Sequence, residues 1–136
     1  MDLIKSMMIS AAGMRAQNTR MRIIAENLAN AGSVASRPGE DPYRRKVVSF
    51  KNQLDRELGV PLVKVDRVRS DRSEFGKRFD PGNPVADAQG YVKLPNVRPL
   101  IESMDMRQAQ RSYEANLNAI EASKQMLLRT IDLLNQ

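Results

Sequence analysis

Residues that break helices are confined to the middle of this chain. All seven prolines lie between positions 38 and 99, and of the seven glycines only Gly13 lies outside the stretch from 32 to 90. Proline ends a helix interior because it lacks an amide donor and its ring clashes with the preceding turn. The two ends are therefore predicted to be long helices. A chain whose first and last thirds must find each other is more typical of a component that assembles with neighbours than of an enzyme.

The amino-acid composition removes most catalytic chemistry. With 136 residues there is room for one domain, or for one helical layer with a small appended module. Cysteine and histidine are both absent, so thiol nucleophiles, disulfides, imidazole metal ligands and the usual proton carrier at neutral pH are missing. Glu102 and Asp105 stand one turn apart, but acidic residues in a first helical turn usually complement the helix dipole. We predict no catalytic residue, cofactor, metal or small-molecule substrate.

Positive charge is concentrated in the middle of the chain. The formal net charge is +6, and residues 31–79 hold twelve basic and seven acidic side chains. A basic helical nucleic-acid-binding protein is the alternative function, because arginines release counterions from phosphates. The interleaving of acidic residues favours a salt-bridged protein surface instead. A small enzyme is the weaker rival.

Apolar residues follow a heptad pattern in the first segment. Steps of three and four connect Ile4, Met7, Ala11, Met14, Asn18, Met21, Ala25 and Leu28. Such a narrow stripe is typical of a coiled-coil seam rather than of an ordinary globular helix. The helix is predicted to end near Asn30 to Gly32, where asparagine or glycine accepts a left-handed cap conformation.

The last segment repeats this pattern. Its stripe contains Gln110, Tyr113, Leu117, Ile120, Lys124, Leu127, Ile131 and Leu134, and its helix starts between Leu100 and Met106. We predict that the two helices form an antiparallel coiled coil in which Ile4 lies near Leu134, Met21 near Leu117 and Leu28 near Gln110. Two readings stay open: a helical hairpin inside a small monomer, or a pair that becomes stable mainly when neighbouring subunits cover it.

The middle is predicted to contain short strands and turns. Residues 43–50 and 62–68 are rich in β-branched and aromatic residues, so they are expected to pair as a hairpin. The run from Asp80 to Pro84 is dense in turn residues, and Tyr91 to Leu94 is a further extended piece. The predicted fold is mainly α with a small β or extended middle, divided into an N-terminal helix (1–32), a middle region (33–98) and a C-terminal helix (99–136).

No targeting or membrane segment is expected. Asp2 stands where a secretory signal would be basic, and Lys5 interrupts the apolar run. No stretch approaches the apolar length of a membrane span. Any export would need another route.

Several motifs resemble the axial rod and hook protein family of the bacterial flagellum. The amino-terminal signature covers residues 10–17 and 22–31, and its most telling part is Asn27-Leu28-Ala29-Asn30. Further matching runs include Pro42-Tyr43-Arg44-Arg45-Lys46 and its continuation to Phe50, 80–84 with 90–97, and 111–117. The resemblance extends over nearly the whole chain.

This resemblance implies a structural role. Family members leave the cell body through the flagellar type III export apparatus without cleavage of a signal. They polymerise helically, with copies of themselves and with other rod subunits, into the basal-body rod that crosses the periplasm. Their terminal helices form an inner coiled coil and their middle contacts adjacent subunits. Arg44, Arg45 and Lys46 are candidates for polar contacts to acidic patches on neighbours, although a solvated basic cluster is an equal reading.

Overall fold

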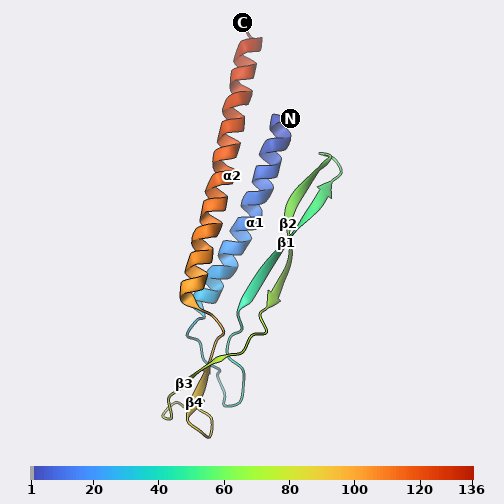
Figure 1. Ribbon diagram of the computed structural model, residues 1–136. Coiled ribbons are helices and arrows are strands. Elements are labelled where there is room, and N and C mark those ends of the chain that lie inside the picture. The colour runs from blue at the N-terminus through green and yellow to red at the C-terminus, as the bar shows by residue number, and fades with distance from the viewer. Residues whose placement is uncertain (1) are drawn as a thin grey trace. The chain divides into compact units, whose positions relative to one another are not determined.

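In the sequence, two long helices flank a middle of short strands. The structure is a computed structural model and describes residues 2–136. In chain order its elements are α1 (Leu3–Ala29), β1 (Lys46–Asp55), β2 (Val60–Ser70), β3 (Gly76–Phe79), β4 (Tyr91–Leu94) and α2 (Pro99–Leu134), as Figure 1 shows. The predicted class, mainly α with a small β middle, is confirmed.

The ends of the helices follow local capping chemistry. The backbone amide of Ile4 donates to the Asp2 carboxylate at 2.9 Å, which satisfies one of the free amides at the start of α1. At the other end, the Asn30 side chain donates to the Glu26 carbonyl oxygen at 2.9 Å. Helix α2 begins at Pro99, where the missing amide donor costs nothing because first-turn amides have no helical partner.

The chain divides into two compact units. The first, here the helix–hairpin unit, contains residues 2–21, 49–67 and 107–136. The second, the loop unit, contains residues 22–48 and 68–106. Each unit is built from segments far apart in sequence.

In the helix–hairpin unit, α1 and α2 lie side by side and antiparallel. Arg20 donates to the Gln108 side chain at 3.1 Å, and a Cβ added at Gly13 would meet the Asn116 amide at 2.7 Å. Since residues further along α1 meet residues earlier in α2, the predicted antiparallel arrangement is confirmed. Figure 1 also shows α2 extending past the start of α1.

The predicted register is wrong. It places Gln125 opposite Gly13, whereas the structure places Asn116 there. This displacement of nine residues is about 14 Å along a helix axis. As a result Ile4 is 56% exposed and Leu134 is 80% exposed, rather than packed on each other. The close approach at Gly13 explains the difference, because small residues let the two backbones come together where larger apolar residues do not.

The hairpin of this unit packs on a second side of α1. Strands β1 and β2 pair, with the Ser49 hydroxyl donating to the Arg67 carbonyl oxygen at 3.4 Å. Ala12 and Ala16 of α1 and Leu62 of β2 are buried. A cleft of about 290 Å³ between α1 and β2 is lined by Ala12, Ala16 and Val63 among others. The predicted hairpin thus exists, with longer strands than the sequence indicated.

In the loop unit, β3 and β4 form a second antiparallel pair. The register joins Gly76 to Leu94 and Phe79 to Tyr91. The Phe79 and Tyr91 rings pack edge to face with centroids 5.3 Å apart. The extended piece from Tyr91 to Leu94 was predicted, whereas β3 was missed because Gly76-Lys77-Arg78-Phe79 has neither alternation nor β-branched residues.

Candidate functional site

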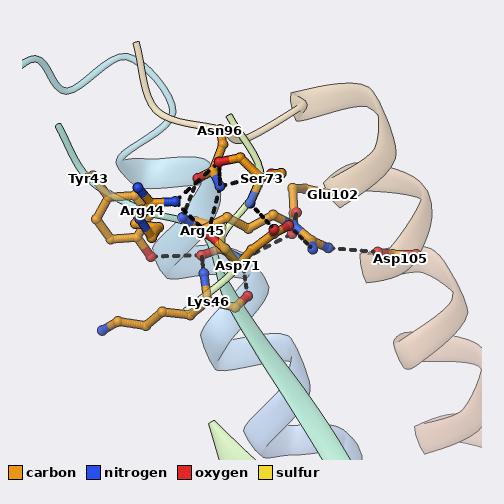
Figure 2. Close-up of polar contacts among 10 residues, drawn as sticks. Tyr43, Arg44, Arg45, Lys46, Asp71, Ser73, Asn96, Glu102 and Asp105 are labelled. Carbon is orange, nitrogen blue, oxygen red and sulfur yellow. Dashed lines mark hydrogen bonds and ion pairs between the residues drawn. The ribbon is translucent and has the colours of Figure 1, made fainter. Parts of the chain in front are cut away.

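A cluster of polar side chains fastens the elements of the loop unit to one another. We call this cluster the polar joint, and Figure 2 shows its residues around Arg45. They come from the last turns of α1, the segment entering β1, the chain after β2, the chain before α2 and the first turns of α2. Its members are Asn27, Tyr43, Arg45, Lys46, Asp71, Asn96 and Glu102.

Asn27 uses its whole hydrogen-bonding capacity. The residue is 1% exposed. Its amide group donates to the Lys46 carbonyl oxygen at 2.9 Å and to Glu102 Oε2 at 3.3 Å. Its oxygen accepts from the Lys46 backbone amide at 2.9 Å and from the Tyr43 hydroxyl at 2.7 Å. A buried amide with every donor and acceptor paired specifies one arrangement of the segments it joins.

Arg45 binds several carboxylates at once. Its Nε donates to Glu102, a side chain that is 1% exposed, and its Nη1 lies 3.3 Å from Asp71 Oδ2. Its Nη2 lies 3.7 Å from Asp105 Oδ2. Burial alone would lower the pKa of Arg45, but the hydrogen bonds and charges of Glu102 and Asp71 outweigh it and raise that pKa. The guanidinium is therefore held as a cation inside a structural ion-pair network.

Asp71 and Asn96 complete the joint. The Ser73 backbone amide donates to Asp71 Oδ1 at 2.8 Å and, with Arg45, holds the pKa of Asp71 below its ordinary value of 3.8. Asn96 accepts from the Arg45 backbone amide at 2.7 Å and donates to the Asp71 carbonyl oxygen at 2.9 Å. Asn96 belongs to the matching run 90–97, but no sequence pattern singled it out as a partner of Arg45, and Asp71 belongs to no repeat or motif.

The two cations beside Arg45 also have partners in their own chain. Arg44 Nη1 donates to the carbonyl oxygens of Asp71 at 3.0 Å and Ser73 at 3.1 Å, and its guanidinium lies 4.2 Å from the Phe75 ring centroid. Lys46 pairs with Glu26, and that hydrogen bond raises the pKa of Lys46. A contact from Arg44, Arg45 or Lys46 to another subunit stays a prediction.

The remaining motif residues surround the joint. Pro42 is buried, and Asn30 accepts from the Ser33 hydroxyl at 3.3 Å at the end of α1. Leu28 is half-buried and Ala29 is exposed. In the Asn27-Leu28-Ala29-Asn30 motif, Asn27 is therefore buried and Asn30 ends the helix. Leu28 and Ala29 between them are partly exposed to solvent.

The predicted seam residues differ in burial, and their place in a coiled-coil or assembly seam stays a prediction. In α2 the buried positions are Glu102, Ala109 and Ser123, and the half-buried Asn116, which faces Gly13, completes this row of residues spaced by seven. All thirteen predicted residues are half-buried or exposed. The half-buried ones are Met7, Ala11, Met14, Met21, Leu28, Tyr113, Ile120 and Leu127. The exposed ones are Ile4, Ala25, Leu117, Ile131 and Leu134.

The polar joint holds segments together and offers little reactive chemistry. Its carboxylates are engaged by Arg45, Asn27 or backbone amides. Among residues 2–136, no group of three or more acidic side chains is placed to hold a metal ion. Within the same range, neither helix has the length and apolar character needed to cross a membrane.

Comparison with known proteins shows close relatives over nearly the full chain. The chain is 52% identical over 126 residues to the flagellar basal-body rod protein FlgC of Agrobacterium fabrum, covering 93% of this chain and 91% of the relative. It is 40% identical to FlgC of Salmonella typhimurium over 135 residues, covering 98% of both, and 42% identical to FlgC of Aquifex aeolicus over 134 residues, covering 97% of both.

This chain belongs to the FlgC family of flagellar basal-body rod proteins. A model of the C-terminal region of the flagellar basal-body rod FlgEFG proteins also matches residues 88–133. That match covers β4 and nearly all of α2. The resemblance inferred from the motifs is thus confirmed.

Proposed function

We propose that this FlgC-family chain is a structural subunit of the flagellar basal-body rod, in its proximal part. It polymerises helically with copies of itself and with homologous rod subunits. The resulting shaft transmits motor torque, and its wall encloses the export channel. The observation that carries this proposal is the full-length similarity to rod proteins, joined to helices that leave their aliphatic residues exposed.

The exposed aliphatic residues support assembly. Leu117, Leu128 and Ile131 are each more than a third exposed in the chain alone. Burying such a side chain contributes about 1.5 to 3 kcal/mol. A monomer does not gain this free energy, whereas a subunit inside a wall of helices does. Apolar faces of this kind mark protein–protein contact surfaces.

The polar joint supports the mechanical role. A shaft needs subunits whose segments keep one arrangement under load. The fully paired Asn27 and the partly buried Arg45–Glu102 ion pair provide such fixed points. This role is structural and needs no turnover. It also leaves the basic segment engaged with carboxylates and carbonyl oxygens of its own chain, which disfavours nucleic-acid binding.

Export and folding are coupled in this proposal. The chain passes unfolded through the type III export apparatus without a cleaved signal, and becomes part of the rod in the periplasm. The helix ends gain stability when neighbours cover them, because binding partners that recognise only the folded form stabilise that form. A labile free subunit therefore stays competent for export.

Gene deletion and complementation test the proposed function. We expect a deletion strain to lose swimming and to yield basal bodies without a complete rod, and we expect the wild-type gene to restore both. Mass spectrometry of purified basal bodies should then detect this chain. Normal basal bodies and swimming in the deletion strain would contradict the proposal.

A further inference from the structure

Helix α1 has a third face that the described parts of α2 and the hairpin cover only in part. Its first face, containing Gly13, meets α2, and its second, containing Ala12 and Ala16, meets the hairpin. Each residue turns a helix by about 100°. The stripe Ile4, Met7, Ala11, Met14 and Met21 is one position away from the seam and therefore points to a third side. These residues are half-buried or exposed.

Helix α2 has a matching free flank. Leu117, Leu128 and Ile131 are 37%, 50% and 45% exposed, and they lie to one side of the row that contains Ala109, Asn116 and Ser123. The flank continues the established helix–helix seam beyond the start of α1. In the observed register Leu3 falls opposite about residue 126, so the last turns of α2 have no part of α1 beside them.

We propose that the third face of α1 docks onto the free flank of α2 in a second copy of the chain. This inference rests on the proposed function and deepens it by naming the two surfaces and their partner. One chain cannot bring the two surfaces together in the register that places Met7 opposite Ile131, because its own helices pair nine residues out of that register. Between two copies that register is available. Met7 then faces Ile131, Met14 faces Lys124 and Met21 faces Leu117.

The charges beside the two stripes match in this same register. Arg15 of α1 faces Glu121 of α2 in the second copy, and Arg22, one heptad later, faces Glu114. The exposed pair Met8 and Leu128 falls in the same row. In an antiparallel coiled coil, such rows beside the apolar seam carry the interhelical ion pairs that choose partner and register. Within residues 2–136 neither Arg15, Glu114 nor Glu121 has an ion-pair partner.

The proposed contact joins two different surfaces, so each copy offers both. Contacts of this head-to-tail kind build rings or open helical assemblies rather than closed symmetric dimers. Each docked copy leaves one α1 face and one α2 flank for the next. The same contact can therefore repeat, adding one copy after another to the assembly.

Disulfide trapping tests the contact, since the chain contains no native cysteine. Met7→Cys and Ile131→Cys copies are co-expressed in the deletion strain, and purified basal bodies are oxidised. Each copy carries a single cysteine, so a disulfide can form only between two copies, and only where the two Cα atoms come within about 7 Å. The matched control pairs Met7→Cys with Met126→Cys, an exposed position on the opposite flank of α2. We expect a band of twice the 15.3 kDa chain mass for the first pair alone.

Charge reversal supplies an independent readout. Arg15→Glu in the Met7→Cys copy should lower the dimer band several-fold, and Glu121→Arg in the Ile131→Cys copy should restore it. Three results would each overturn the inference. The first is an equally strong dimer band in the control pair, and the second is the absence of a band for Met7→Cys with Ile131→Cys in rods that do assemble. The third is a dimer band that the double charge reversal does not restore. Swimming restored by the variants would leave the proposed function standing in those cases. Failure of the wild-type gene to restore swimming would instead contradict the proposed function.

Discussion

The side chain of Asn27 pairs with the backbone of Lys46 through two hydrogen bonds of 2.9 Å, one donated and one accepted. This is the pattern by which two strands pair, made here by a helix residue. Through these two hydrogen bonds, Asn27 of α1 pairs with the first residue of β1 much as a neighbouring strand would. Because Tyr43 and Glu102 use the remaining capacity of the amide, no other residue type satisfies the same set of partners.

Replacing Asn27 should destabilise the fold. Asn27→Ala leaves the Lys46 amide and carbonyl without their side-chain partner in a buried place, and each such loss costs about 1 to 3 kcal/mol. We expect a loss of about 2 to 4 kcal/mol in the free energy of unfolding, measured by urea denaturation followed by circular dichroism. Asn18→Ala is the control, because Asn18 is exposed on the same helix. Equal effects at both positions would contradict the role of the joint.

Removing the charge of Glu102 should lower the free energy of unfolding by less than removing the only partner of a buried charge would. Glu102→Gln breaks the ion pair with Arg45, and such changes cost about 3 to 5 kcal/mol when no other partner remains. Since Asp71 and Asp105 still face the guanidinium, we expect a loss of about 1 to 3 kcal/mol. Thermal unfolding of Glu102→Gln, Asp71→Asn and the double variant measures this. A double variant no worse than the sum of the singles would show that the carboxylates do not substitute for one another.

The contact between Gly13 and Asn116 predicts a specific coupling. Gly13→Ala improves helix propensity by about 1 kcal/mol, but its Cβ displaces the Asn116 amide, which donates to the Ser112 carbonyl oxygen at 2.9 Å. We expect Gly13→Ala to stabilise the chain by about 1 kcal/mol in an Asn116→Ala background and not in the wild type. Identical gains in both backgrounds would contradict the observed register.

Asp71 should make stability depend on pH in the acid range only. The folded pKa of Asp71 lies below its ordinary value of 3.8, so the unfolded state binds its proton first as pH falls. The stabilisation is therefore present above that ordinary value and is lost as pH falls through the lower folded pKa. We expect the difference in unfolding free energy between wild type and Asp71→Asn to stay constant near neutral pH and to shrink on acidification below that ordinary value. A difference that grows on acidification would reverse the assigned sign.

Two glycines with positive φ allow the cost of backbone strain to be measured apart from the cost of a side-chain clash. Gly59 has φ of +68° with open space around it, whereas Gly90 has φ of +86° and a Cβ there would lie 3.0 Å from the Phe79 ring. Gly59→Ala should cost about 1 to 2 kcal/mol for the left-handed backbone alone. Gly90→Ala should cost more, and Phe79→Leu should reduce the excess. Equal costs at both glycines, by urea denaturation, would show that the ring contact is not limiting.

Sequence patterns predicted the elements better than their packing. Proline and glycine placement located both helices and the turn after Asp80, because those residues act through local backbone geometry. The register failed because the heptad rule selects the most apolar stripe, whereas the two helices meet through Gly13, Ala109 and Asn116, where small size matters more than hydrophobicity. The polar joint was only partly predictable. Asn27, Tyr43 and Asn96 belong to matching motif runs, whereas the position of Glu102 in a first helical turn indicates only a partner of the helix dipole. The contacts of Asp71 and Asn96 with Arg45 depend on the fold.

Helix α1 divides its circumference among α2, the hairpin and a face left for another copy. A helix placed in this way has almost no side reserved for solvent once the assembly forms. In a library of single substitutions selected for swimming, α1 should therefore tolerate as few changes as a helix in the centre of a globular protein, despite its arginines and asparagines. Its polar residues would be as restricted as its methionines.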